Sequence, residues 1–175
     1  VRTKAFGQGL EESLKYRGAD LVGILNGIDQ DSWNPQRDPA LPSPIDPLDP
    51  SAGKKACKRS LLEEMKLPPG SRAPLFGVVS RLYRQKGLDL LLRILPSLMS
   101  NSKANFVILG SGDGKEEQAF RELARAYPTR IGVFIGFDDG LARRIFAGTD
   151  FFLIPSRFEP CGLAQQYAMR YGSLP

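Results

Sequence analysis

The 175-residue sequence contains no histidine, only two cysteines and no long apolar run. Without histidine, the chain alone cannot complete a Ser-His-Asp triad or a histidine-ligated metal site. Cys57 and Cys161 are too few for a disulfide framework or a structural zinc site, and this usage is typical of a reducing cytoplasm. Because no stretch of about 18 apolar residues is present, the sequence predicts no membrane-spanning helix. We therefore expect a cytoplasmic protein without a metal centre.

The sequence also has no strong excess of charge of one sign. It carries 24 Lys and Arg against 19 Asp and Glu, a net charge of +5, and the two kinds are mixed along the chain. This distribution gives little support to nucleic-acid binding. Hydrophobic residues make up 42% of the chain, which excludes disorder as its main state. The length is that of one domain or of one piece of a larger enzyme.

The first third of the chain is interrupted by proline. Apolar spacing predicts a short helix over residues 9–18 and a short strand over residues 19–29 that ends in an Asn-Gly turn. Six prolines then crowd residues 35–50, and because proline lacks an amide donor we expect an ordered loop or a linker there. Residues 51–67 have helical spacing, with Ser51 as the expected N-cap.

From residue 74 onward, short apolar runs alternate with amphipathic segments. The expected strands cover residues 74–80, 105–110, 131–136 and 150–155. The expected helices cover residues 87–100, 114–127, 139–149 and 162–172. This alternation predicts a parallel sheet with helices on both faces, that is, a Rossmann-like doubly wound α/β fold.

Ligands of doubly wound sheets bind at the carboxyl ends of the strands, so the residues after each expected strand are site candidates. Arg81 and Lys86 follow the first strand, five residues apart across a turn, and can converge on one anion such as a diphosphate. The alternative is two solvated loop cations. Gly136 and Phe137 follow the third strand, where Phe137 either stacks on a base or simply packs against the protein.

The segment after the fourth strand combines a carboxylate with a helix start. Glu159 can bind sugar hydroxyls while the backbone amides of the next residues hold a phosphate. These amides belong to Cys161, Gly162 and Leu163. The alternative is that Glu159 only caps the helix. The glycine-rich residues 110–114 do not fit the dinucleotide fingerprint, which favours a tight turn without a ligand and argues against a dehydrogenase.

Several longer segments carry a resemblance to a known family. VSRLYRQKGLDLL, LGSGDGKEEQAF, IGFDDGLARRIFAGTDFFLIPSRFEPCGLAQQYAMRYGSLP and, upstream, GILNGIDQDSWNP together resemble the bacterial glycogen (starch) synthases of glycosyltransferase family 5. The resemblance extends from about Phe6 to Pro175 and is weakest over residues 36–50. It implies a truncated C-terminal half of a two-domain GT-B enzyme. Residues 1–72 would be an interdomain segment, and residues 73–175 a nucleotide-sugar-binding domain without its last strands.

The resemblance further implies transfer of glucose from ADP-glucose to the non-reducing end of an α-1,4-glucan, with retention of configuration and without a metal ion or other cofactor. By analogy, Arg81 and Lys86 grip the distal diphosphate, and Glu159 is the catalytically important sugar-binding carboxylate. The remaining matches are a cleft-facing asparagine, a phosphate loop and a base-contacting turn in which the family usually has tyrosine: Asn26, the backbone of Cys161, Gly162 and Leu163, and Gly136 with Phe137.

Two departures and two rival hypotheses accompany the resemblance. Ala164 stands where the family has threonine, and losing one hydrogen bond costs about 1 kcal/mol. The N-terminal domain of the family is not among these residues, so we expect the isolated chain to be inactive.

A sucrose- or mannosyl-type retaining transferase would commonly carry a second glutamate where this chain has Tyr167. A non-catalytic nucleotide- or glucan-binding module is the rival of a different class.

Overall fold

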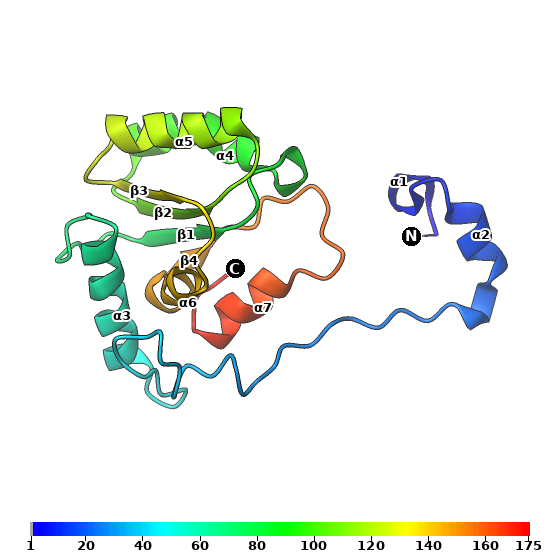
Figure 1. Ribbon diagram of the computed structural model, residues 1–175, viewed down its shortest axis with the longest axis horizontal. Coiled ribbons are helices and arrows are strands. Elements are labelled where there is room, and N and C mark those ends of the chain that lie inside the picture. The colour runs from blue at the N-terminus through cyan, green and yellow to red at the C-terminus, as the bar shows by residue number, and fades with distance from the viewer. Residues whose placement is uncertain (1) are drawn as a thin grey trace.

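The computed structural model describes residues 2–175, as a folded body and an N-terminal arm, residues 2–28, that extends away from it (Figure 1). The arm contains the helices α1 (Lys4–Gly7) and α2 (Glu11–Tyr16) and the 3₁₀ turn η1 (Gly18–Asp20). The helix expected over residues 9–18 is confirmed by α2. The strand expected over residues 19–29 is wrong. Its apolar residues lie extended and exposed because no neighbouring strand is available to pair with them.

The body is built on a parallel sheet with the order β3-β2-β1-β4. The strands are β1 (Leu75–Val79), β2 (Asn105–Gly110), β3 (Ile131–Ile135) and β4 (Phe151–Phe152). All six residues of β2 are buried, as expected for a central parallel strand covered on both faces. β4 is shorter than the expected 150–155, since only its two phenylalanines pair with β1 and Pro155 lacks an amide donor.

Helices cover both faces of this sheet (Figure 1). One face carries α4 (Leu88–Asn101) and α5 (Gly114–Ala126), and the other carries α3 (Ser51–Glu64), α6 (Asp139–Gly148) and α7 (Leu163–Arg170). Each face has its own core cluster, one with Leu91 and Phe120, the other with Leu61 and Ile145. The expected doubly wound α/β class is thus confirmed, together with its four helices after residue 87.

A close approach between β1 and α6 explains one glycine of the sheet. A Cβ atom on Gly77 would lie 2.7 Å from Cγ2 of Thr149 and 2.9 Å from Cγ2 of Ile145. Any larger side chain would therefore push α6 away from the strand. The strand keeps glycine here because the helix packs directly on its backbone.

The proline-rich segment is an ordered loop, as expected, and it packs on the body. Trp33 stacks on the ring of Tyr167 with 3.8 Å between the ring centroids, and the guanidinium of Arg143 lies 4.0 Å from the Trp33 ring. The helix expected over 51–67 is confirmed by α3, but Ser51 is its first helical residue, and Pro50 occupies the N-cap position. α3 belongs to the same core cluster as α6. The domain boundary expected between residues 72 and 73 stays a prediction.

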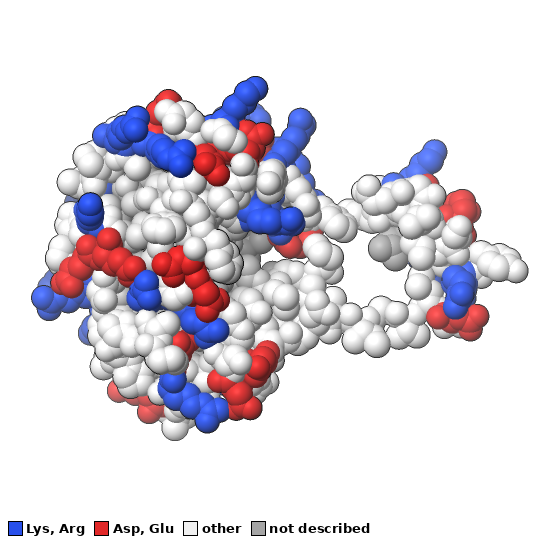
Figure 2. Space-filling model, viewed as in Figure 1, with Lys and Arg blue, Asp and Glu red and all other residues white. Residues whose placement is uncertain are grey.

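The surface carries charges of both signs, interspersed over the face that Figure 2 shows. This mixture agrees with the sequence, in which basic and acidic residues alternate. None of the helices between residues 2 and 175 combines the length and the apolar character that a membrane crossing requires.

Candidate functional site

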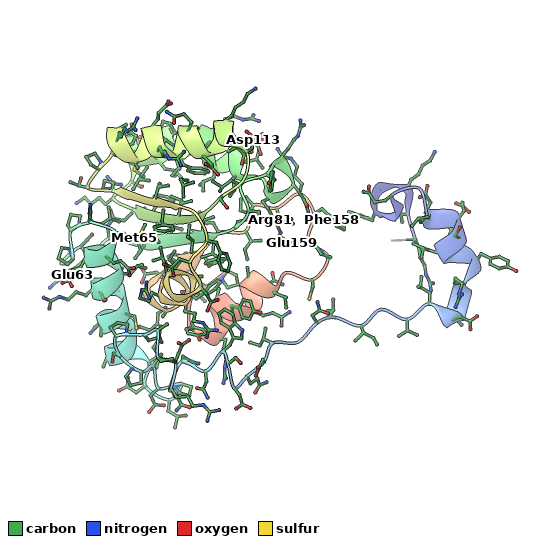
Figure 3. The ribbon with its side chains drawn as sticks, in the orientation of Figure 1. Glu63, Met65, Arg81, Asp113, Phe158 and Glu159 are labelled. Atoms are coloured by element: carbon green, nitrogen blue, oxygen red, sulfur yellow. The ribbon has the colours of Figure 1, made fainter. Side chains whose placement is uncertain are left out.

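The loops that leave the carboxyl ends of β1 and β4 enclose a pocket of about 330 Å³, here called the β1–β4 pocket. Its lining includes most of the expected site residues: Asn26, Arg81, Lys86, Glu159, Cys161, Gly162 and Leu163. Figure 3 shows Arg81, Phe158 and Glu159 close together at this end of the sheet. The structure therefore gathers residues from the arm, the β1–α4 loop and the β4–α7 loop at one place.

A second pocket, of about 220 Å³, lies between the ends of β1 and β3 and is here called the β1–β3 pocket. It contains Gly136 and Phe137, and it shares Val79, Ser80 and Arg81 with the first pocket. Phe137 is 91% exposed, so it does not pack against the protein, and the alternative reading of a packed phenylalanine fails. The two pockets adjoin at Arg81.

Lys86 and Glu159 both line the β1–β4 pocket, where they form an ion pair. Lys86 Nζ lies 2.6 Å from Glu159 Oε1, and Ser156 Oγ donates a hydrogen bond of 2.7 Å to the same oxygen. Burial alone would raise the pKa of Glu159. The hydrogen bonds from Lys86 and Ser156 and the charges of Lys86 and Arg81 lower this pKa by more than burial raises it, so the pKa of Glu159 lies below its usual value. Glu159 is therefore ionised at neutral pH and accepts hydrogen bonds there.

Arg81 is the cation available at the junction of the pockets. Its side chain is exposed and forms no ion pair with any residue that the structure describes. Its charge contributes to lowering the pKa of Glu159, which places it near that carboxylate. Both cations line the same pocket, where Lys86 is paired with Glu159, so the reading of a solvated loop cation does not describe Lys86; the convergence of both on one anion stays a prediction.

The N-terminus of α7 forms another wall of the β1–β4 pocket. Gly162 is the N-cap residue, with φ of 74°, and no side chain caps the helix. Glu159 thus does not cap α7, and the alternative reading of this carboxylate is wrong. The first-turn amides of an uncapped helix are suitable donors to an anion. Ala164 also lines this pocket and offers no hydroxyl.

The glycine-rich residues 110–114 have a packing role, in agreement with the reading of a tight turn. A Cβ atom on Gly110 would lie 2.0 Å from the carbonyl oxygen of Ser80, and one on Gly112 would lie 2.4 Å from that of Leu82. The Gly112 amide already donates to Glu117 Oε1 at 2.9 Å. These glycines let the β2–α5 turn approach the β1–α4 loop.

Sequence reasoning missed the residues that tie the two loops of the candidate site together. Arg157 forms a bidentate ion pair with Asp89, with nitrogen–oxygen distances of 2.6 and 2.7 Å. The Arg157 amide donates to the Gln85 carbonyl at 2.9 Å, and Gln85 Nε2 donates to the Phe158 carbonyl at 3.2 Å. The only signal in the sequence was the position of Ser156 and Arg157 next to Glu159. The partners on the β1–α4 loop carried none.

Asn26 reaches the pocket from the arm. Its carbonyl oxygen accepts a hydrogen bond of 3.2 Å from Gln166 Nε2 and a contact of 3.6 Å from Cys161 Sγ. The arm is thus held to α7 at this point. As for metals, residues 2–175 contain no group of three or more His, Cys, Asp or Glu side chains placed to hold an ion.

The comparison with known families agrees with this geometry. Residues 63–175, which form most of the body, match the glycosyl transferases group 1. The chain belongs to this family. The match covers the sheet of the glycosyl transferase, the two loops that carry Lys86 and Glu159, and the lining of both pockets apart from Asn26.

Within this family, the chain is similar to glycogen synthases and to a starch synthase. The chain is 51% identical over 175 residues to a glycogen synthase of Anaeromyxobacter dehalogenans (strain 2CP-C) and 48% identical to one of Rhodospirillum rubrum. It covers 36% of each of these proteins, so it spans about a third of their length. The catalytic domain of starch synthase IV from Arabidopsis thaliana, bound to ADP and acarbose, is 38% identical with a TM-score of 0.91. The match covers 99% of this chain and 36% of that one.

Proposed function

We propose that this glycosyl transferase chain forms the donor-binding part of a retaining glucosyltransferase, which transfers glucose from ADP-glucose to the non-reducing end of an α-1,4-glucan in glycogen or starch synthesis. One observation carries the proposal: Arg81, Lys86 and Glu159, from two loops, converge on one pocket that adjoins the exposed Phe137. The similarity to glycogen synthases and to an ADP-bound starch synthase supports this choice of substrate.

The order of the groups along the two pockets matches the order of the parts of a nucleotide sugar. Phe137 offers a ring face to the base in the β1–β3 pocket. Arg81, where the pockets meet, and the first-turn amides of α7 suit the diphosphate. Glu159 is ionised and accepts hydrogen bonds, so it suits the hydroxyls of the sugar. The donor would then lie along the carboxyl ends of the strands.

The proposed reaction transfers a glucosyl unit. The bond between the anomeric carbon and the distal phosphate oxygen breaks, and a bond from that carbon to an acceptor hydroxyl oxygen forms, while the hydroxyl proton passes to the departing ADP. Negative charge grows on the diphosphate as the bond breaks. Arg81 and Lys86 would stabilise that charge, and we propose that they take this role without a metal ion or another cofactor. The acceptor glucan would enter between this chain and an N-terminal domain, in the cytoplasm.

Calorimetric titration of the chain with ADP tests the donor site, with UDP and NAD as comparison ligands. We expect ADP to bind and the double variant Arg81→Ala/Lys86→Ala to bind it at least about tenfold more weakly, because two charged contacts are lost. The matched control is Lys115→Ala/Arg125→Ala, which removes the same charge from α5 and should leave binding unchanged. Equal losses in both double variants, or tighter binding of NAD than of ADP, would contradict the proposal.

The catalytic part of the proposal needs a longer protein that contains this segment. Glu159→Gln there keeps the shape of the side chain and removes its charge, and we expect glucosyl transfer from ADP-glucose to fall about a hundredfold or more, as when a transition-state contact is lost. ADP binding should change little. A longer protein that binds ADP but transfers no glucose would identify the non-catalytic module instead.

A further inference from the structure

A third pocket lies at the opposite edge of the sheet, where the strands begin. It has a volume of about 600 Å³ and is here called the amino-edge pocket. The segments that precede β1, β2 and β3 line it, with these residues: Pro68, Ser71, Arg72, Ala73, Pro74, Lys103, Asn105, Thr129 and Arg130. Because β1 is five residues long, roughly 15 Å of strand separate this pocket from the candidate donor site.

The charge of the amino-edge pocket is of one sign, in contrast to the mixed surface elsewhere. Three of its lining residues, Arg72, Lys103 and Arg130, are basic and none is acidic. Arg72 and Lys103 form no ion pair within the described chain. Asp150, at the start of β4 on the same edge, is already held by Lys58 at 2.6 Å and by the Leu75 amide at 2.7 Å. An anion in the pocket would relieve the repulsion among its three cations.

One of these cations is already oriented by the protein. The guanidinium of Arg130 donates to the Ala104 carbonyl through Nε at 2.9 Å and through Nη2 at 2.6 Å, and to the Ser102 carbonyl at 3.0 Å. Its Nη1 has no hydrogen-bond partner among residues 2–175. These contacts fix the plane of the guanidinium before a ligand binds, so little side-chain entropy is lost on binding.

Neutral donors complete the lining. Asn105 is only 2% exposed, and its Nδ2 donates to Ser71 Oγ at 2.9 Å, which holds both side chains in place at the start of β2. Thr129 adds a second hydroxyl. The prolines and Ala73 supply an apolar wall. The volume exceeds that needed for a bare phosphate and falls in the range of small-molecule sites.

We propose that the amino-edge pocket binds a phosphate monoester, with the phosphate dianion on Arg72, Lys103 and Arg130 and its organic part against the hydroxyls and the proline wall. A dianion with three acceptor oxygens matches three cations from three separate loops. Arg72 can offer the paired hydrogen bonds of a guanidinium, and Arg130 can donate through Nη1, the nitrogen that its contacts with the Ala104 and Ser102 carbonyls leave available. The site is distinct from the candidate donor site, so both can be occupied at once. The proposal does not depend on the proposed function.

The test is a ¹⁵N NMR titration of the chain with inorganic phosphate and then with glycerol 3-phosphate, against chloride at equal ionic strength. It uses the Arg81→Gln/Lys86→Gln background, so that phosphate binding at the donor site does not interfere. We expect saturable shifts confined to the amides of residues 71–73, 103–105 and 129–130. Adding Arg72→Gln/Lys103→Gln should weaken binding at least about tenfold, since two charge-assisted contacts are lost.

A double variant on α5 is the control for this titration. Lys115→Gln/Arg125→Gln removes the same charge from α5 and should leave the shifts and the affinity unchanged. Because the Arg72 and Lys103 side chains make no hydrogen bond within the described residues, their replacement should also leave the melting temperature unchanged. Shifts scattered over all basic residues, equal affinity in both double variants, or no saturation by about 10 mM phosphate would overturn the proposal.

Discussion

At the scale of single residues, the buried carboxylate of Asp38 shows how one side chain anchors a loop that has no regular structure. Asp38 accepts hydrogen bonds from the Tyr171 hydroxyl and, at 2.9 Å, from Arg143 Nη1. Burial alone would raise the pKa of Asp38. The hydrogen bonds from Tyr171, the Ala40 amide and Arg143 lower this pKa by more than burial raises it, so the pKa of Asp38 lies below its usual value. The ionised form of Asp38 thus stabilises the fold.

We expect Tyr171→Phe to lower the free energy of unfolding by about 1 to 3 kcal/mol at pH 7, because a buried charged acceptor loses a donor. The folded pKa of Asp38 lies below its unfolded value near 3.9, so its contribution is complete above that value and is lost as the pH falls through the folded pKa. Without Tyr171 the folded pKa rises, so the difference between variant and parent narrows below about pH 4. Urea unfolding followed by Trp33 fluorescence measures the free energy of unfolding of variant and parent at each pH.

Tyr16→Phe is the matched control for this experiment, since Tyr16 is 92% exposed and its hydroxyl makes no hydrogen bond within the part of the chain that the structure covers. It should leave the free energy of unfolding unchanged at every pH. A loss for Tyr171→Phe that is as large at about pH 3 as at pH 7 would show that the Asp38 contact is not its cause.

Residue-level contacts in the candidate site were only partly predictable from sequence. The residues after the strands pointed to Arg81, Lys86 and Glu159, because the carboxyl ends of parallel strands meet at one edge. Their roles came from the resemblance, and the Lys86–Glu159 ion pair joins residues 73 positions apart, a separation that no local pattern encodes. Ser156, which shares Glu159 Oε1 with Lys86, lies three residues before Glu159, but sequence reasoning did not single it out.

At the scale of elements, the β1–α4 and β4–α7 loops act as one unit. Besides the Arg157–Asp89 ion pair, a close contact joins them: a Cβ atom on Gly87, which has φ of 68°, would lie 1.9 Å from the Pro155 carbonyl oxygen. Arg157 does not line the β1–β4 pocket, so we expect that it acts on the site only indirectly, by holding the loop that places Glu159 beside Lys86. It is a positioning residue.

We expect Arg157→Gln and Asp89→Asn each to weaken ADP-glucose binding by about five- to tenfold, and the double variant to weaken it no further, because both remove the same contact. ADP, which lacks the sugar that Glu159 would bind, should lose much less affinity. Calorimetric titration with both ligands measures the split. Arg93→Gln is the control, as Arg93 is exposed and lies 4.0 Å from Asp89 on α4. Losses that add in the double variant would refute a shared positioning role.

Elements were predicted best where the apolar pattern and the tertiary environment agree. The four strands and four helices after residue 74 were located from their apolar runs, since each run is buried in the sheet or packed on it. Residues 19–29 show the limit of the method. The apolar residues Val22, Ile24 and Leu25 fit a strand pattern, but a strand also needs a pairing partner, which the pattern cannot supply.

At the scale of the whole molecule, two irregular segments differ in how they are held. Residues 29–50 form a loop that is tied to α6 and α7 through Asp38 and the Trp33–Tyr167 stack. The extended end of the arm, residues 21–28, exposes Val22, Ile24 and Leu25 by 75, 89 and 77%. It is held to the body at Asn26, whose carbonyl oxygen accepts from Gln166 Nε2 and from Cys161 Sγ. Figure 1 shows the arm standing away from the sheet and its helices.

Limited proteolysis distinguishes these two segments. Thermolysin cleaves before exposed Val, Ile and Leu, so we expect the first cuts between residues 21 and 25, while residues 29–45 resist despite their lack of helix or strand. The remaining body should melt within about 3 °C of the intact chain, since the arm buries little apolar surface. Trp33 fluorescence should not change, because its stack on Tyr167 lies within the body. Cleavage within residues 29–45 at a similar rate, or a drop of about 8 °C or more in the melting temperature, would mean that the arm is part of one cooperative fold, and the division into arm and body would be wrong.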